Sequence, residues 1–340
     1  MNFFHILSEI EKTDPEVFER FDSRREVFKH LTGFGKKLTA ATLPMAMGAI
    51  FNKAYGQTSS APSVFDVLNF ALKLEYLEAT FYNLGLAGDG TVGTGAASTT
   101  VSASQTVLRN QFSETNRNAL LKIRTDENNH VNFLRAAITQ AGGTPIAAPA
   151  VSQFDFTGGK GNNAGPFAGV FSSAAVFLAV AQSLEDTGVR AYKGGAPYLA
   201  SNKDVLTAAL NIHSVEARHA SRLRTMRRGG PLNNEASKTA AGSNPSTSPK
   251  SWISGQDGGG AAPTYTAPIY GAGQAPSYTP AGITFPAEDN VTQGGVNLQT
   301  TLASLNFPAA AFSEAFDEPL PVPTVITIAQ TFTITGSTFF

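Results

Sequence analysis

The feature that most constrains this chain is a pair of Glu-x-x-His motifs, each inside a long stretch with the apolar periodicity of a helix. The first motif joins Glu127 to His130, and the second joins Glu216 to His219. Side chains three residues apart lie on the same face of an α-helix, and in both stretches that face is otherwise apolar. Both motifs therefore direct a carboxylate and an imidazole into the interior of a helical protein.

Two further helical stretches carry glutamates on their apolar face. Glu75 and Glu78 interrupt one apolar stripe, and Glu185 interrupts another. Start and stop signals, mainly Ser, Gly and Pro, bound the stretches. The predicted helices cover residues 63–84, 105–141 with a potential break near Ser113, 167–192, and 202–228.

The residues that face the predicted core include no Lys or Arg that would neutralise these glutamates. An unpaired buried carboxylate costs several kcal/mol, and a pair of divalent metal ions would supply the missing positive charge. The chain has no Cys, so the ligands would be carboxylate oxygen and imidazole nitrogen, which suit iron, manganese or zinc. The lack of Cys also excludes disulfides, iron–sulfur clusters and cysteine nucleophiles.

The predicted helices also form an internal repeat. Tyr82 follows Glu75 by seven residues, and Tyr192 follows Glu185 by the same interval. Each of these helices precedes a Glu-x-x-His helix, so the chain is expected to contain two similar helical hairpins around a site with approximate two-fold symmetry. The connection between the second and third helices is long enough to cross the bundle, whereas the short link between the third and fourth makes them antiparallel neighbours.

One glutamate from each of two helices, combined with Glu-x-x-His from each of two others, resembles the ligand set of the ferritin-like di-iron carboxylate superfamily, which includes bacterioferritins and rubrerythrins. Segments 74–82, 215–220 and 315–320 are similar to exported bacterial ferritin-like proteins related to plant desiccation-related proteins. The resemblance implies an all-α core, a ferritin-like four-helix bundle over residues 61–230. A long, mostly irregular extension over residues 231–340, packing on the bundle or on a partner, would follow it.

The resemblance also implies a role for each core residue. Glu127 and Glu216 would bridge the two metal ions. Glu75 and Glu185 would be terminal carboxylate ligands, and His130 and His219 would each bind one ion. Glu78 is either a fifth carboxylate ligand or a hydrogen-bonded neighbour of the site. Tyr82 and Tyr192 resemble tyrosines that form hydrogen bonds near such centres.

Asp126 resembles an acid that orients a ligand histidine on the facing helix, here His219. Val215 stands at the equivalent position before Glu216, so the surroundings of the two metal ions should differ. His213 is expected to be a core histidine rather than a ligand.

The implied cofactor is two metal ions, with iron favoured and manganese or zinc as alternatives. The implied function is redox chemistry on Fe(II), peroxide or dioxygen, of a ferroxidase or peroxidase kind, or metal handling under stress. The alternative is a non-catalytic, metal-stabilised structural or protective protein of the desiccation-related kind, and a homo-oligomer is an open possibility. A formal net charge of −1 argues against nucleic acid as a partner, and no integral membrane span is expected.

The two ends of the chain give weaker signals. Arg24 and Arg25 resemble a twin-arginine export signal and precede an apolar stretch over 38–51, which predicts a periplasmic or extracellular protein; the alternative is a retained amphipathic helix within residues 1–60. In the extension, 296–305 is expected to be helical, and the alternation over 324–335 predicts a strand.

Overall fold

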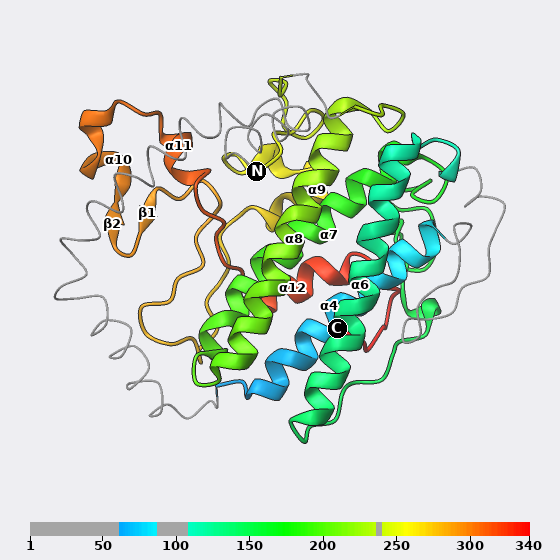
Figure 1. Cartoon of the computed structure of the whole chain (residues 1–340), viewed down its shortest axis with the longest axis horizontal. Coiled ribbons are helices and arrows are strands. Elements are labelled where there is room, and N and C mark those ends of the chain that lie inside the picture. Colours follow the sequence, from blue (N-terminus) through cyan, green and yellow to red (C-terminus); the bar gives the residue numbers. More distant parts are fainter. Residues whose placement is uncertain (1–60, 87–107, 236–239) are drawn as a thin grey trace, which may run out of the picture.

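Four long helices dominate the computed structural model, which describes residues 61–86, 108–235 and 240–340. They are α4 (Val64–Gly85), α6 (Glu114–Gln140), α7 (Ala174–Gly195) and α8 (Lys203–Gly229). The closest packing is between α4 and α6 and between α7 and α8, and the two hairpins also meet along α4 and α7 (Figure 1). The prediction of an all-α four-helix bundle is therefore confirmed.

Side-chain caps explain where three of the helices begin. The backbone N–H of Ser63 donates to Asp66 Oδ2 at 2.8 Å, and the N–H of Asp66 donates back to Ser63 Oγ at 3.2 Å, which forms a capping box for α4. The N–H of Asn116 donates to Ser113 Oγ at the start of α6. Asn202 caps α8 in the same way. These caps satisfy backbone donors that have no partner within the helix.

The second long helix is shorter than predicted. The sequence predicts a helix over 105–141, whereas α6 begins at Glu114. Ser113 ends the preceding turn with extended backbone angles and caps α6, so the potential break is a true helix start. Residues 105–107 lie outside the described residues.

The third long helix also begins later than predicted, at Ala174 instead of residue 167. The backbone at Gly169 has a φ of 82°, which lies in the left-handed region and interrupts a helical path. The residues before Ala174 form turns that bury Phe167 and Val170 against the bundle. The apolar periodicity of this segment therefore reflects burial without a continuous helix.

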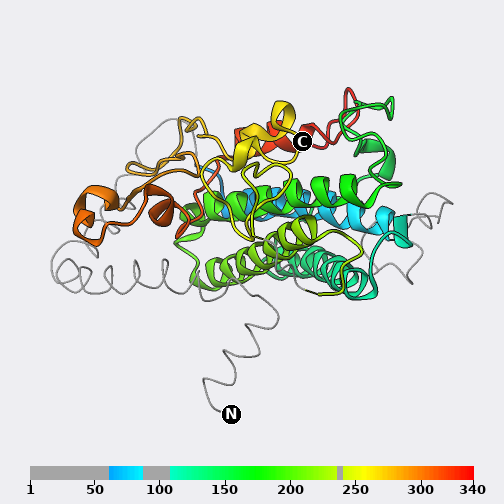
Figure 2. The ribbon, with the colours of Figure 1, turned by 90° about the horizontal axis from the view of Figure 1, so that it is seen from above.

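Short elements make up the rest of the described chain. They are η3 (Val151–Gln153), η4 (Ala196–Leu199), η5 (Asp257–Gly259), α9 (Pro263–Thr266), η6 (Ala267–Ile269), β1 (Thr292–Gln293), β2 (Val296–Asn297), α10 (Leu298–Thr301), η7 (Ala303–Leu305), α11 (Ala309–Ser313) and α12 (Val322–Gln330). Strands β1 and β2 pair antiparallel, with Thr292 opposite Asn297. Helix α12 packs on α7. Figure 2 shows the yellow and red parts of residues 240–340 along the side of the bundle formed by α4 and α7, while the orange part, with β1, β2, α10 and α11, lies beyond one end of the bundle.

Two predictions in the extension need correction. The strand predicted over 324–335 is wrong for most of its length, because α12 occupies Val322–Gln330 and only Thr333 forms a β-bridge, with Phe154. Pro323 lies in the first turn of α12, where its missing N–H costs nothing, and burial against α7 favours the helix. The helix predicted over 296–305 is replaced in part by β2, and helical turns follow it.

The predicted export signal and the alternative N-terminal helix fall within residues 1–60, which lie outside the described residues, so export stays a prediction. In the described part of the chain, none of the helices combines the length and the apolar character that a membrane span needs.

The bundle core consists of two main apolar clusters, one toward each end. The first, here called the aromatic end, contains Phe81, Tyr82, Leu120, Phe177 and Met226. The second, here called the opposite end, contains Leu68, Leu134, Tyr192, Ala209 and Ile212. The middle turns of all four long helices lie between these clusters, and they carry the predicted site.

Candidate metal centre

Seven polar side chains gather between the two apolar ends, and they are called the acidic centre below. They are Glu75 and Glu78 from α4, Glu127 and His130 from α6, Glu185 from α7, and Glu216 and His219 from α8. Each side chain is buried, and none is more than 9% exposed. Among the residues that the structure describes, the only ion-pair partners of these glutamates are the two histidines.

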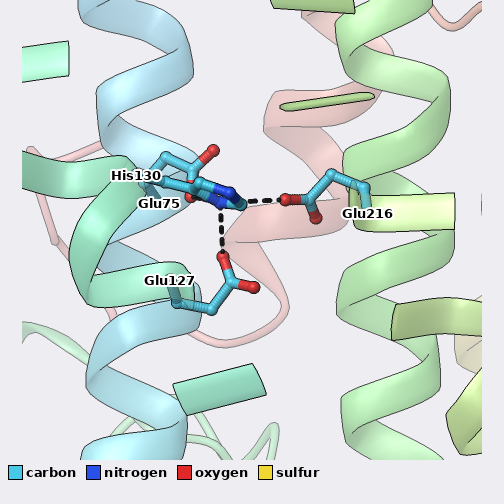
Figure 3. A group of neighbouring side chains, drawn as sticks. All are labelled: Glu75, Glu127, His130 and Glu216. Atoms are coloured by element: carbon cyan, nitrogen blue, oxygen red, sulfur yellow. Dashed lines mark hydrogen bonds and ion pairs between the residues drawn. The ribbon is translucent and has the colours of Figure 1, made fainter. Parts of the chain in front are cut away.

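One half of the acidic centre is organised around His130. Its Nδ1 lies 3.2 Å from Glu75 Oε2, 3.3 Å from Glu127 Oε2 and 3.3 Å from Glu216 Oε1. Figure 3 shows Glu216 reaching toward the imidazole from the opposite helix, while Glu127 approaches the ring from the same helix. Three helices therefore direct carboxylate oxygens at one imidazole nitrogen.

The other half is organised around His219. Its Nδ1 lies 2.8 Å from Glu127 Oε1 and 3.2 Å from Glu185 Oε2. Its other ring nitrogen, Nε2, lies 3.3 Å from Asp126 Oδ2 on α6. The contact across the bundle between Asp126 and His219 has no counterpart in the first half, because Val215 occupies the position equivalent to Asp126.

The side chains form two groups of possible metal ligands. In each group one ligand atom per residue lies within 4.8 Å of all the others; the groups are Glu75, Glu127, His130 and Glu216, and Glu127, Glu185, Glu216 and His219. Glu127 and Glu216 belong to both groups. Two adjacent cation sites that share two carboxylates are the arrangement that two bridging glutamates would produce.

Two tyrosines hold the carboxylates that are not shared. Tyr82 Oη donates to Glu185 Oε1 at 2.6 Å, and Tyr192 Oη donates to Glu75 Oε1. Each tyrosine thus reaches the glutamate of the other hairpin, as an approximate two-fold axis requires. Burial, followed by the charge of the bonded glutamate, raises the pKa of both phenols, so each keeps the proton that it donates.

The symmetry fails at Glu78. Its equivalent on α7 is Gly188, three residues after Glu185 just as Glu78 is three after Glu75. A Cβ atom at position 188 would lie 2.8 Å from Glu216 Oε2 and 3.2 Å from Glu78 Oε1. The glycine therefore makes space for two carboxylates. Sequence reasoning did not single out Gly188, although aligning the two hairpins would have paired it with Glu78.

The electrostatics of the acidic centre are those of carboxylates held too close together. Burial and the nearby charge of Glu185 raise the pKa of Glu127 to about 7. Burial and the neighbouring glutamates raise the pKa of Glu78 and of Glu216 well above the usual range. Burial also raises the pKa of Glu75, but the charge of His130 and the hydrogen bonds from His130 and Tyr192 together outweigh it and lower that pKa overall.

The two imidazoles are correspondingly basic. Burial lowers the pKa of each, but the surrounding carboxylates together outweigh it, led by Glu75 for His130 and by Glu185 for His219. Both pKa values therefore lie above the usual range. The carboxylates thus favour the protonated form of both imidazoles, and burial favours the protonated form of several carboxylates.

Two oxygens in the acidic centre, Glu78 Oε2 and Glu216 Oε2, have no hydrogen-bond partner. Glu127 Oε1 and Glu216 Oε1 have only an imidazole nitrogen beside them. A buried acceptor without a hydrogen bond is costly, and cations coordinated by oxygen and nitrogen would satisfy all of these atoms. The donor set therefore fits divalent metal ions. His213 is outside both ligand groups; it is half-buried, and burial lowers its pKa.

The geometry agrees with a comparison of the sequence with known families. A family model described as a ferritin-like domain matches residues 63–228, which span all four long helices and the whole acidic centre. No curated protein matches the chain.

Proposed function

Since residues 63–228 form a ferritin-like domain and the chain thereby belongs to the ferritin-like superfamily, we propose that the acidic centre binds two metal ions and supports redox chemistry on Fe(II), peroxide or dioxygen. The observation that carries the proposal is the pair of ligand groups that share Glu127 and Glu216. Iron is favoured, and manganese or zinc would also suit the oxygen and nitrogen donors.

Each proposed ion has its own side chains. Glu75 and His130 would hold one ion and Glu185 and His219 the other, while the shared glutamates would bridge the two. Two ions held there would supply redox chemistry toward dioxygen or peroxide. Apolar clusters lie on both sides of the centre, and the aromatic end packs large buried side chains against it.

The surrounding side chains would keep the terminal carboxylates in place and supply protons. The hydroxyls of Tyr82 and Tyr192 fix one oxygen of Glu185 and Glu75, respectively, and leave the second oxygen for an ion. Glu78 has an oxygen without a hydrogen bond and a raised pKa, so it can hold a proton beside Glu216 or serve as a further carboxylate ligand.

Metal titration of purified variants tests the proposal. Glu127→Ala and Glu216→Ala should each weaken both ions together and leave well below two ions per chain, because a bridging carboxylate contacts both. His130→Ala and His219→Ala should preferentially weaken one ion. Glu114→Gln, at an exposed position in the first turn of α6, is the matched control and should bind metal like the unchanged chain. Two ions retained at unchanged affinity in both bridging variants would contradict the proposal.

A structural or protective role without catalysis is the second candidate, and one observation favours it. The extension is fixed to the bundle through buried ion pairs of Arg190 and Arg224, so a large part of the chain serves the structure and takes no part in chemistry at the acidic centre. Consumption of dioxygen or peroxide that depends on Fe(II) and is lost in Glu127→Ala separates the two. A protein that binds two ions and consumes neither oxidant would support the structural candidate.

A further inference from the structure

The two ends of the bundle are unequal, although the metal-ligand pattern repeats. Aligning Glu75 with Glu185 on α4 and α7, and Glu127 with Glu216 on α6 and α8, assigns an equivalent to every position of the four long helices. The packing agrees with this alignment at Gly85 and its equivalent Gly195. A Cβ at Gly85 would lie 2.2 Å from the Phe177 ring, and one at Gly195 would lie 3.3 Å from Val67, the equivalent of Phe177.

The aromatic end is closed by large side chains. The rings of Phe81 and Phe177 stack with centroids 4.6 Å apart, and Tyr82 meets Phe177 edge to face at 6.1 Å. Leu120 and Met226 complete the packing from the other two helices. All five side chains are buried, so the residues that the structure describes close this end in front of Tyr82 and the centre behind it.

The equivalent positions at the opposite end carry smaller residues. Phe81, Phe177, Leu120 and Met226 correspond to Ala191, Val67, Ala209 and Ala137. All four of these smaller side chains line a cavity of about 710 Å³. The volume lies within the range of small-molecule binding sites, roughly 300–1,000 Å³. The cavity is thus the space that the large side chains fill at the aromatic end.

The inner wall of the cavity borders the acidic centre. Tyr192 lines the cavity, and its hydroxyl donates to Glu75. Leu74, the residue before Glu75, lines it as well, and Phe133 lines it while remaining 46% exposed to solvent. A molecule in this cavity would be separated from the nearest glutamate of the centre by one tyrosine side chain.

We propose that this cavity binds an uncharged organic molecule with a hydrocarbon body. Most of the lining is aliphatic or aromatic, and its charged members are Asp66, Lys73 and Asp204, which do not favour an anion. Interiors are otherwise packed without voids, and an unfilled cavity lined by small residues lowers stability, so a repeated helical pair that loses four large side chains at one end is explained by a ligand. Binding itself rests on the cavity alone, whereas a part for the ligand in redox chemistry rests on the proposed function.

Titration of the full chain with N-phenyl-1-naphthylamine, an uncharged fluorescent probe, tests the proposal. We expect saturable binding of one probe per chain and its displacement by 1-decanol. Ala191→Phe and Ala209→Leu restore the residues of the aromatic end, and each should weaken probe binding at least tenfold without lowering the melting temperature. Ala175→Phe, at an exposed position of α7 outside the cavity, is the matched control and should leave binding unchanged.

Ala191→Phe and Ala209→Leu, the two variants that fill the cavity, decide the result. Absence of saturable binding to the unchanged chain, or equal binding by both variants, would overturn the proposal. If Ala191→Phe does not fold, Ala209→Leu and Val67→Phe decide. The Glu127→Ala variant separates this proposal from the metal proposal, because it should lose metal and still bind the probe. Loss of metal affinity without loss of probe binding would support a ligand cavity separate from the metal ligands. Metal retained in Glu127→Ala would count against the proposed metal centre and would leave the cavity proposal unaffected.

Discussion

Two buried clusters of charged residues lie on either side of α7, and they are neutralised in different ways. On one side, Glu185 belongs to the acidic centre. On the other, the neighbouring residue Asp186 belongs to a second cluster, here called the arginine clamp. Its members are Asp186, Arg190, Arg224, Asp257, Tyr270 and Glu288, which come from α7, α8 and the extension.

In the arginine clamp every carboxylate has a guanidinium partner. The two Nη atoms of Arg224 donate to the two carboxylate oxygens of Asp257, each at 2.9 Å, and its Nε donates to Asp186 Oδ1 at 3.2 Å. Arg190 Nε lies 2.7 Å from Glu288 Oε1. Charges that are paired in this way, with most of their polar atoms hydrogen-bonded, are tolerated in a protein interior.

The contrast between the acidic centre and the arginine clamp separates buried carboxylates that suit a metal ion from those that do not need one. In the acidic centre two oxygens have no partner and two more have only an imidazole beside them, whereas one oxygen of the arginine clamp, Glu288 Oε2, has no hydrogen-bond partner. The clamp is complete with the residues of the chain, whereas the centre has two imidazoles for five glutamates. Burial of acids alone is therefore no sign of a metal site, but burial without a matching cation is one.

The arginine clamp also explains why the extension belongs to the fold. Arg190 donates to backbone carbonyls of Glu318 at 2.9 Å and Pro286 at 2.8 Å, so one side chain of α7 holds two separate parts of the extension. Leu320 adds a backbone hydrogen bond to the carbonyl of Arg190 at 3.0 Å. The extension thus covers the outer side of the helix that supplies Glu185 to the centre.

The largest expected effect comes from breaking the clamp. Arg224→Ala leaves Asp186 and Asp257 buried without their cation, which should lower the free energy of unfolding by roughly 3–5 kcal/mol. The measurement is urea unfolding followed by circular dichroism, on metal-free protein so that the centre does not contribute. Arg218→Ala, at an exposed position of the same helix, is the control and should change stability by less than about 0.5 kcal/mol. A cost below about 1 kcal/mol for Arg224→Ala would show that the clamp is not structural.

Metal removal should affect the centre and leave the clamp alone. Ions that bind only the folded chain stabilise it by about 3–4 kcal/mol when they are present at a hundred to a thousand times their Kd. Metal-loaded protein should therefore unfold at a markedly higher temperature than protein treated with a chelator. Equal melting temperatures, with metal loss verified by elemental analysis, would contradict a metal site among these glutamates.

The stability difference between metal-loaded and metal-free protein should depend on pH, and this dependence tests the carboxylates of the acidic centre. The pKa of Glu127 is raised to about 7 in the folded, metal-free chain, so its contribution to stability is complete below the unfolded pKa and is lost as the pH rises through about 7. The loss amounts to at most about 1.4 kcal/mol per pH unit for one proton. Bound ions require ionised carboxylates, so the loaded form should not share this loss, and the gap between the two forms should widen from pH 5 to pH 8.

The clamp provides an internal reference for this measurement. Burial raises the pKa of Glu288 to about 8, against the opposing charge of Arg190, so Glu288 also makes the chain less stable as the pH rises. That contribution is the same with and without metal, and it cancels in the difference. A gap that narrows with increasing pH would indicate that the carboxylates of the centre are ionised before metal binds.

The four-helix bundle and the grouping of the acidic residues could be predicted because both depend on local spacing. Glu127 and His130 lie one turn apart on an apolar face, and that relation survives any error in the helix ends. The starts of α6 and α7 were harder to predict, because the cap at Ser113 sets the first and the positive φ at Gly169 delays the second.

The arginine clamp could not be predicted, and the reason is physical. Most acceptors of Arg190 are backbone carbonyls, which every residue carries, so no sequence pattern marks them. The same applies to α12, whose alternating residues predict a strand while packing against α7 stabilises a helix. The cavity was present in the sequence as a difference between equivalent positions, but only the packing showed that Phe81 and Ala191 face equivalent spaces.

The smallest predicted effect concerns the one contact that makes the two halves of the centre differ. Asp126 Oδ2 lies 3.3 Å from His219 Nε2, and Asp126 also pairs with Lys122. These two partners outweigh burial and lower the pKa of Asp126 to about 2, so it is an anion that can fix the orientation of the imidazole. Partners of this kind typically contribute ten- to a hundred-fold to metal affinity.

Asp126→Asn should therefore weaken the ion held by His219 by roughly ten- to a hundred-fold, or about 1.4–2.7 kcal/mol, and leave the ion held by His130 nearly unchanged. Lys122→Ala is the control, because it removes the exposed partner of Asp126 and keeps the contact with His219.

The reciprocal variant, Val215→Asp, places an acid at the equivalent position and should tighten the binding of the ion at His130, making the two halves of the centre more alike. Two-site metal titration, with helicity checked by circular dichroism, distinguishes the ions. Equal weakening of both ions in Asp126→Asn would mean that the acid acts on the centre as a whole, because an acid that orients only one imidazole cannot loosen the ion bound to the other.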